Sequence, residues 1–448
     1  MFLAISILQK PEYYRQYRLR TINPAPRETS MHLIPMIEQI PFFYKRITKI
    51  YPDKPWVEMV EKIEQTRNKF PHRVGQAELD NWFSFALTRW EYNQIELFEG
   101  SNWINLVGAM NLANRVSTLC ESVQIGGKGP QELVERFRGA IQNPSDLRAI
   151  RFELYIAELL KTRGCIINWP LENKGDETFD LLVQPPNDLP EFELECKSFA
   201  GDKGASVTLA DGQRLLEACI KLEKVEELFK LFPVQTGTAS ILSVKLHKEL
   251  PRDEDKLTIL AKSVLSVIKG EDEIEHVSFE IEHSYVEIRG NIDDQDACFN
   301  ASLNLPGATL AFAAFGSAKE GWQGIRIAYT GKFTLFEKAE KTAKRAIKTQ
   351  LTGTRPGAVA LQFINDTAES IRNSNVPENK YRTLANKIFT KENAALVIIA
   401  GDIEPRPIRP SIPPYSPNAF MAEYCTFAAF DNQNGKHPNS KLKTLFGL

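Results

Sequence analysis

The chain has 448 residues, of which 43% are hydrophobic and 25% are charged, the proportions of a globular protein long enough for two or three domains. Its formal net charge of −2 means that any nucleic-acid affinity must come from local basic patches, because the chain as a whole is not basic. No apolar run reaches membrane-spanning length, and the short apolar start at residues 2–8 lacks a preceding positive charge, which makes it a poor signal peptide.

The six cysteines are scattered through the chain without the C-x-x-C spacing of a zinc or redox site. Several of them lie in apolar runs, which favours buried thiols in a reducing compartment over a disulfide framework. We therefore expect a cytoplasmic protein without a membrane partner. The six histidines show no metal-ligand spacing, and the chain contains no Walker loop, no G-x-S-x-G elbow and no dinucleotide fingerprint.

Residues 1–140 have the periodicity of a mainly helical region that is rich in aromatic residues, and its tryptophans are expected in the core. Residues 9–49 lean basic and carry Tyr13, Tyr14 and Tyr17. Basic and aromatic side chains together can bind a nucleic-acid backbone. A solvated surface segment explains the same composition, so both interpretations stay open here.

From about residue 145 the pattern changes to alternating helices and strands. Ser145-Asp146 predicts the cap of a helix that runs to about Arg163, with Gly164 just past its end. The elements expected after this helix are a β segment at 165–169, two strands at 179–184 and 191–197, a helix at about 209–230 and a strand at 239–245. This order of helix, three strands, helix and strand predicts an αβββαβ core with a mixed sheet.

Residues 250–448 read as further α/β structure. The expected elements are a helix near 254–268, strands near 276–290, 308–314 and 325–330, a helix near 335–351, and strands at 357–364 and 395–400. Six prolines predict an extended connector over 404–417. The helix near 335–351 carries a stripe of basic residues, which either contacts phosphates or is simply solvated: Lys338, Lys341, Lys344, Arg345 and Lys348.

These patterns predict an α/β class (α+β over the whole chain) with three parts. Residues 1–140 form the mainly helical N-terminal region, residues 141–250 form the αβββαβ core, and residues 251–448 form the C-terminal α/β region.

The most informative segment is the pair of strands at 179–184 and 191–197. The prolines of the segment between them are incompatible with a helix and with the hydrogen bonds of a paired strand, so this segment is predicted to form a hairpin turn. A hairpin symmetric about the point between Asn187 and Asp188 places Asp180 directly opposite Glu195, with Cβ atoms about 5 Å apart. Lys197 follows Glu195 by two residues, so it shares the same face. Two carboxylates at this distance repel unless a proton or a cation lies between them.

The helix near 145–163 offers a third carboxylate. On a helical wheel its apolar face is centred on Phe152 and Leu159, and Glu153 lies on the flank of that face. Glu158 lies on the side of the helix that is expected to face solvent. Because a buried carboxylate needs a partner, Glu153 is the candidate that points at the site, and Glu158 is expected to be a surface charge.

The tripeptide E-x-K occurs three times, so context must select among the copies. Residues 254–256 open a helix in a charge run, and residues 378–380 follow a proline in a loop. Only Glu195-Cys196-Lys197 ends an apolar strand that is paired with a strand bearing an aspartate. An ordinary hairpin with solvated acidic edge residues remains the alternative, since Glu191 and Glu193 share the same face.

In this arrangement the chain resembles the PD-(D/E)XK nuclease superfamily, also called restriction-endonuclease-like. The matching pattern is a helix with Glu153, a strand with Asp180 and then Glu195-x-Lys197, over residues 145–246. Phe179 stands where the family name has proline, and many members accept an apolar residue there. Gln213, at the start of the next expected helix, matches a polar residue that some families place near the metal; helix capping explains it equally well.

The resemblance implies a function and a role for each residue. Asp180, Glu195 and the backbone carbonyl of Cys196 would hold Mg²⁺ or Mn²⁺, whose preference for hard oxygen ligands suits this set. Lys197 would orient the attacking water or neutralise the phosphate oxygens, and Glu153 would assist as a further metal-binding or catalytic carboxylate.

The function that we expect is therefore a metal-dependent endonuclease acting on DNA. The alternatives are an RNA nuclease and a non-catalytic nucleic-acid-binding or scaffold protein that kept the fold. The sequence leaves open whether the chain forms a homo-oligomer.

Overall fold

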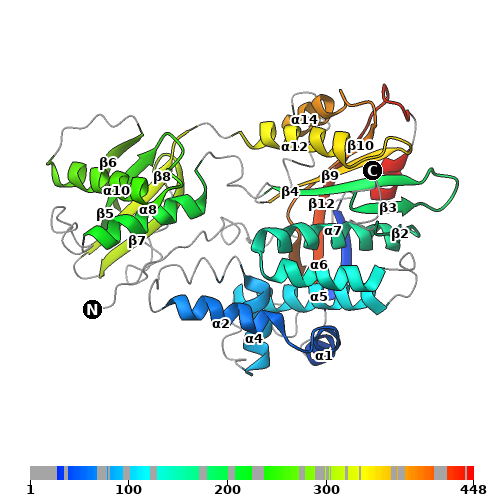
Figure 1. Cartoon of the computed structure of the whole chain (residues 1–448), viewed down its shortest axis with the longest axis horizontal. Helices are drawn as coiled ribbons and strands as arrows, with labels where there is room; N and C mark the ends of the chain where they lie inside the picture. The colour runs from blue at the N-terminus through cyan, green and yellow to red at the C-terminus, as the bar shows by residue number, and fades with distance from the viewer. Residues whose placement is uncertain are drawn as a thin grey trace. The chain divides into compact units, whose positions relative to one another are not determined.

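The computed structural model divides the chain into two compact units (Figure 1). One comprises Pro11–Lys62, Asp80–Gly201 and Phe336–Leu448 and is called here the eight-stranded unit; the other comprises Met1–Lys10, Ile63–Leu79 and Asp202–Leu335 and is called the four-stranded unit. The structure describes residues 28–34, 39–67, 81–93, 101–121, 129–170, 179–199, 207–223, 237–271, 278–287, 304–317, 321–331, 334–364, 379–407, 421–438 and 441–447, and the single residues Glu78, Cys298, Ser302 and Ile371.

The eight-stranded unit is built on a mixed sheet in the order β1-β12-β10-β9-β4-β3-β2, with β11 also paired to β12. Its strands are β1 (Glu28–Ile34), β2 (Ile166–Asn168), β3 (Leu181–Gln184), β4 (Phe192–Phe199), β9 (Gly357–Phe363), β10 (Ala394–Ala400), β11 (Glu404–Pro407) and β12 (Met421–Asp431). The pairs β4–β9 and β9–β10 are parallel and the other pairs are antiparallel. The mixed α/β class expected from the sequence is confirmed.

Helices cover both faces of this sheet. The helices of the unit are α1 (Ile40–Ile50), α2 (Pro55–Arg67, whose last residues belong to the other unit), α4 (Trp82–Glu91), α5 (Ser101–Glu121), α6 (Gly129–Ile141), α7 (Pro144–Thr162), α12 (Leu335–Thr349), α14 (Lys380–Ile388) and the 3₁₀ turn η6 (Leu442–Phe446). On the face of α12 and α14, Phe363 stacks between Phe199 and Phe336, with ring centroids 5.6 and 5.2 Å away.

Helix α7 lies between the other helices and the sheet. Its residues Leu147, Ile150 and Leu154 join the core of the N-terminal helices, whereas Phe152 and Ile156 join the core under the sheet. Because both sides of α7 are covered, a polar residue on its flank is buried and needs a partner from a neighbouring element.

The ends of α7 follow from local chemistry. The helix begins two residues earlier than a cap at Ser145 implies, because Asn143 is the cap: its side chain accepts a hydrogen bond from the backbone N–H of Ser145 at 3.0 Å. Gly164 has a φ of +83°, as the expected position past the helix end requires. The N–H of Cys165 donates to the carbonyl of Leu160, which closes the helix.

The expected hairpin is present with the expected register. Strand β3 pairs with β4 through Leu181↔Leu194, Leu182↔Glu193 and Val183↔Phe192. Asn187 and Asp188 both have positive φ in the turn, a conformation that these two residue types tolerate better than most.

The expected αβββαβ core over residues 145–246 is wrong in its last two elements. Helix α8 (Leu209–Leu222) and strand β5 (Thr238–Leu246) exist, but β5 belongs to the other sheet. The element order is completed instead by α12 and by β9, which lies parallel beside β4 and pairs Glu195 with Val359. The expected domain 141–250 is therefore replaced by a discontinuous unit, into which residues 202–335 are inserted.

The four-stranded unit has its own mixed sheet in the order β6-β5-β8-β7. Its other strands are β6 (Phe279–Glu287), β7 (Ala308–Ser317) and β8 (Gly321–Tyr329), and α8 and α10 (Glu254–Lys269) pack on one face. The core between them includes Leu216 and Val264 from the helices and Val244 and Ile327 from the strands.

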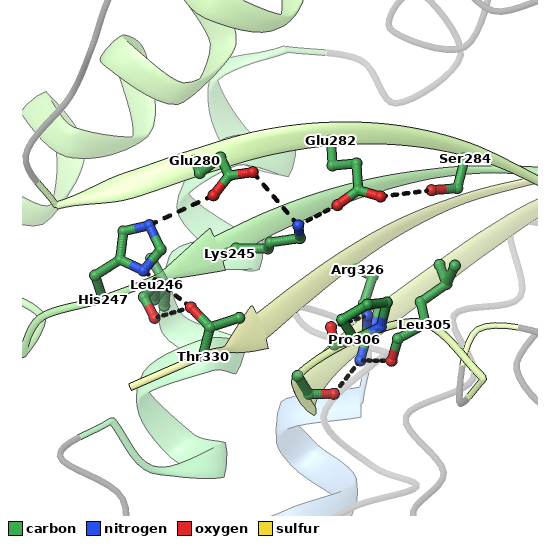
Figure 2. A network of polar contacts seen from close by, with 11 residues as sticks. Lys245, Leu246, His247, Glu280, Glu282, Ser284, Leu305, Pro306, Arg326 and Thr330 are labelled. Atoms are coloured by element: carbon green, nitrogen blue, oxygen red, sulfur yellow. Dashed lines mark hydrogen bonds and ion pairs between the residues drawn. The ribbon is translucent and has the colours of Figure 1, made fainter. Parts of the chain in front are cut away.

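Polar residues occupy part of the other face of that sheet (Figure 2). Lys245 pairs with Glu280 and Glu282 from the edge strand β6. Arg326 is fully buried, and its guanidinium donates to the carbonyls of Leu305 and Pro306. Burial lowers the pKa of Arg326 to about 10, and the charge of Glu282 opposes this only in part. This guanidinium fastens the turn before β7 to the sheet.

Most other expected elements are present within one to four residues of their predicted ends. The exceptions include helices and strands. Helix α8 ends at Leu222 rather than at about residue 230, and α14 was not expected. β1 lies within the region expected to be mainly helical, and β12 was not expected at all. Of the expected Pro-rich connector, residues 404–407 form β11, and residues 408–417 lie outside the described residues.

Two expectations on chemistry can also be compared with the structure. Within the described residues, which include all six cysteines, no disulfide forms. No helix in the described ranges is long and apolar enough to cross a membrane.

Candidate functional site

Three segments of the eight-stranded unit bring the predicted side chains together. Glu153 comes from α7, Asp180 directly precedes β3, and Glu195 and Lys197 lie on β4. The register of the hairpin, extended by one residue beyond Leu181↔Leu194, places Asp180 opposite Glu195. The regular ladder stops there, and the side chain of Asp180 takes over: its Oδ2 accepts a hydrogen bond from the backbone N–H of Cys196 at 2.7 Å.

Glu195 is fully buried, and its two carboxylate oxygens differ. Oε1 accepts a hydrogen bond from the ammonium group of Lys197. Oε2 is buried and has no hydrogen-bond partner among the described residues. A carboxylate oxygen without a partner is costly in a protein interior, so this atom marks a place where the fold alone does not satisfy the chemistry.

Glu153 is also buried, with 3% of its surface exposed, but both of its oxygens are occupied. Oε1 accepts from the indole N–H of Trp169 at 2.8 Å and from Nη1 of Arg136 at 3.1 Å, and Oε2 accepts from Nη2 of Arg136 at 2.8 Å. The helical wheel thus places Glu153 correctly. It misplaces Glu158, whose side chain is only 17% exposed and pairs with Arg115 instead of lying on the surface.

Arg136, from α6, is the residue of this cluster that the sequence pattern did not reveal. Besides its two bonds to Glu153, its Nη2 lies 3.9 Å from Oδ1 of Asp180. A weak signal was present: on a helical wheel Arg136 lies next to Ala140, at the edge of the buried face of α6. An arginine there stretches its charged end toward whatever acid a neighbouring element offers, and nothing in the local sequence names that acid.

The charges of the cluster do not balance. Three carboxylates (Glu153, Asp180 and Glu195) face two cations (Lys197 and Arg136), so these five side chains carry one excess negative charge when all are ionised. Burial, reinforced by the charge of Asp180, raises the pKa of Glu195 to about 8 and that of Glu153 to about 7. Burial opposes the charge on Lys197, but Glu195 and Asp180 outweigh it and raise the pKa of that lysine.

The cluster has a buried side and an accessible side. The side chains of Asp180, Lys197 and Arg136 are 19%, 29% and 30% exposed. Glu153 and Glu195 lie behind them and are almost fully buried. Solvent therefore reaches one carboxylate and both cations, while the two inner acids are shielded from it.

The other two acids on this face of the hairpin, Glu191 and Glu193, bind residues outside the cluster. Glu193 is fully buried and accepts a hydrogen bond from the backbone N–H of Thr352 at 2.7 Å. Glu191 pairs with Arg355 at 2.9 Å. These contacts attach β4 to the segment before β9. The acidic face of the hairpin is thus divided between a structural part and the cluster around Glu195.

The fit of a divalent ion follows from the donors that remain. Within the described ranges, no three His, Cys, Asp or Glu side chains are grouped as a metal site. Asp180 and Glu195 supply two carboxylates, and Cys196, the residue after Glu195, supplies a backbone carbonyl. Mg²⁺ is usually held by one or two carboxylates together with waters and substrate phosphates. The unpartnered Oε2 of Glu195 fits that need.

Cys196 contributes to this arrangement only through its backbone. Its side chain is buried in the core under α7, on the face opposite to Glu195. Burial, together with the charge of Asp180, raises the pKa of the thiol well above its usual value, so a thiolate ligand is not formed there.

Gln213, the predicted auxiliary residue, is not part of this sheet. It lies on α8 in the four-stranded unit, and its side-chain amide nitrogen is buried without a hydrogen-bond partner in the described structure. The sequence placed it near the site because it assigned α8 to the core.

Comparisons of the chain with protein-family models, with curated proteins and with solved structures gave no match. The functional argument therefore depends on the site itself.

Proposed function

We propose that this chain is a metal-dependent nuclease of the PD-(D/E)XK type, which hydrolyses phosphodiester bonds in DNA. The observation that carries the proposal is the inner oxygen of Glu195, which is buried beside Asp180 and Lys197 without a hydrogen-bond partner among the described residues. Buried acids with strongly shifted pKa values in an accessible cluster are typical of functional sites. The exposed mixture of carboxylate and cations suits a divalent ion together with a phosphate.

In this proposal each side chain has a definite task. Asp180 and Glu195, with the carbonyl of Cys196, hold Mg²⁺ or Mn²⁺. The ion, when bound, lowers the pKa of water and offsets charge that builds on the phosphate. Lys197 is held beside the inner acid by its bond to Glu195, where its ammonium can orient the attacking water or bind a phosphate oxygen. Glu153 is engaged by Arg136 and Trp169 and supports the site from behind.

The competing explanation is a buried ion-pair network in a non-catalytic nucleic-acid-binding or scaffold protein. The pairs Lys197–Glu195 and Arg136–Glu153 would serve such a network. Such a network leaves one oxygen of Glu195 without a partner among the described residues, whereas a bound divalent ion would use that oxygen. Calorimetry with Mn²⁺ separates the two proposals, because a structural network predicts no heat of binding that depends on Asp180.

The decisive test is cleavage of plasmid DNA in the presence of Mg²⁺ or Mn²⁺. We expect cleavage by the wild-type chain and a loss of about a hundredfold or more in Asp180→Asn and in Lys197→Met. Lys256→Ala is the matched control, since Lys256 belongs to a second E-x-K segment that is exposed at the start of α10. Equal cleavage by the wild type and both site variants would falsify the proposal.

A panel of linear, single-stranded and RNA substrates then identifies the polymer that is cut, because DNA and RNA present the same phosphodiester. Preference for RNA would replace DNA in the proposal and leave the roles of Asp180, Glu195 and Lys197 unchanged. We place this activity in the cytoplasm, consistent with the absence of disulfides among the described residues.

A further inference from the structure

Arg136 is a cation that no E-x-K motif includes, and it comes from α6, outside the hairpin and outside α7. Its guanidinium binds Glu153 through two parallel hydrogen bonds of 3.1 and 2.8 Å. The same Nη2 lies 3.9 Å from Oδ1 of Asp180. One side chain therefore contacts acids from two separate segments of the site.

The orientation of this guanidinium is set by its two hydrogen bonds to Glu153. A two-pronged bond between arginine and a carboxylate fixes the plane of both groups, which a lysine cannot do. Glu153 is fixed in turn by the indole N–H of Trp169 at 2.8 Å. With 3% of its surface exposed, Glu153 cannot turn its charge to solvent, so it acts as the anchor that holds Arg136 beside Asp180.

We propose that Arg136 is a positioning residue of the nuclease site, a built-in counter-cation that holds Glu153 and Asp180 in place and at the same time limits the affinity for the divalent ion. The inference depends on the proposed function. Its physical basis is that a fixed positive charge close to Asp180 repels an incoming cation, while the same charge keeps the three acids from separating.

Two effects of opposite sign distinguish this role from a merely structural one. In Arg136→Gln the cluster carries one more excess negative charge, so Mn²⁺ should bind about tenfold more tightly. The acids are then no longer held in register, so DNA cleavage at saturating Mn²⁺ should fall about tenfold to a hundredfold. Simple loss of structure would weaken both binding and cleavage.

Arg136→Lys keeps the charge but not the two-pronged bond. We expect its Mn²⁺ affinity to stay within about threefold of the wild type, with cleavage still reduced. If Arg136→Gln does not fold, this variant carries the test alone: an affinity more than tenfold from the wild type, or undiminished cleavage, overturns the inference.

Arg138→Gln is the matched control on the same helix. Arg138 pairs with Asp53 at the surface, where its side chain is 36% exposed, and the variant should match the wild type in both measurements. Calorimetry of the full-length chain with Mn²⁺ gives the affinity, and a plasmid assay gives the rate.

The outcomes separate the two proposals. If the wild type binds Mn²⁺ and Arg136→Gln binds it no more tightly, this inference fails while the nuclease proposal stands. If the wild type binds no Mn²⁺, the nuclease proposal fails and this inference fails with it. Tighter binding together with slower cleavage supports both.

Discussion

Two glutamates of the same sheet, Glu195 on β4 and Glu423 on β12, are both fully buried but differ in their hydrogen-bond and ion-pair partners. Each oxygen of Glu423 accepts from a different arginine, Arg115 at 2.9 Å and Arg151 at 3.0 Å. Among the described residues, Glu195 pairs with one cation, Lys197, and its other oxygen has no hydrogen-bond partner.

The electrostatic result follows from these partners. Burial tends to raise the pKa of Glu423, but Arg115 and Arg151 outweigh it and lower that pKa below the ordinary value. At Glu195, burial and the charge of Asp180 act in the same direction and raise the pKa to about 8. The same residue type at the same burial thus has opposite shifts.

The difference in charge balance distinguishes a structural ion-pair network from a candidate functional site in the same sheet. Around Glu423 the charges are balanced, because Arg115 also binds Glu158, and two acids meet two arginines. This network ties α5, α7 and β12 together. Among the described side chains around Glu195, three acids meet two cations, and Asp180, Lys197 and Arg136 are partly exposed there.

Removing the central acid of the balanced network should have the largest effect on stability. Glu423→Gln removes the acid that Arg151 pairs with and leaves the buried Arg115 with Glu158 as its remaining counter-charge, and we expect the free energy of unfolding to fall by about 3–5 kcal/mol. Urea denaturation measures this change. A loss below about 1 kcal/mol would show that the arginines find other partners and that the contrast with Glu195 is smaller than inferred.

The corresponding change at the site should act in the other direction. Glu195→Gln removes an acid that the metal-free fold holds at a cost, so the free energy of unfolding without divalent ions should rise at pH 8, on the order of 1 kcal/mol. The raised pKa values of Glu195 and Glu153 mean that their contribution to stability is complete below the ordinary value of 4.5 and is lost as the pH rises toward about 8 and about 7.

Thermal unfolding in EDTA from pH 5 to pH 9 therefore provides the measurement. We expect the wild type to lose stability across this range and Glu195→Gln to lose less. Glu423 has a lowered pKa, so its contribution is present above the ordinary carboxyl pKa and disappears only as the pH falls below that value. A flat profile for the wild type between pH 5 and pH 8 would contradict the excess of acid at the site.

A smaller effect than that of Glu423→Gln is expected at the rim of the balanced network. Glu158 binds Nε of Arg115 and is partly exposed. In Glu158→Gln, Arg115 keeps Glu423 as its counter-charge, so we expect the free energy of unfolding to fall by about 1 kcal/mol. Chemical denaturation of Glu158→Gln and Glu423→Gln under the same conditions shows which variant loses more stability. An equal loss of unfolding free energy in both would show that the two acids share the charge of Arg115 evenly.

Much of the site could be predicted because its hairpin is local. The prolines of the turn and the two apolar strands determine which residues pair, and the structure has the register that places Asp180 opposite Glu195. Apolar periodicity on α7 likewise placed Glu153 on a buried flank. In each case the relevant contacts join residues close in sequence or on one helix face.

The remaining errors come from contacts between distant segments. β5 and β9 are both apolar strands that follow a helix, and nothing local shows that β9 rather than β5 lies beside β4. β12 was missed although it pairs with three strands. Arg136 was missed because the acid that it binds lies on another helix.

By itself, the sequence determined where most helices and strands form, the register of the hairpin and the set of acids and lysine that it presents, because turn chemistry and side-chain periodicity act over a few residues. Only the tertiary structure decided which strand completes the sheet, how Arg136 reaches Glu153 and why Glu423 is balanced while Glu195 is not. Those outcomes depend on packing between segments far apart in the chain, where burial makes each unmatched charge decisive.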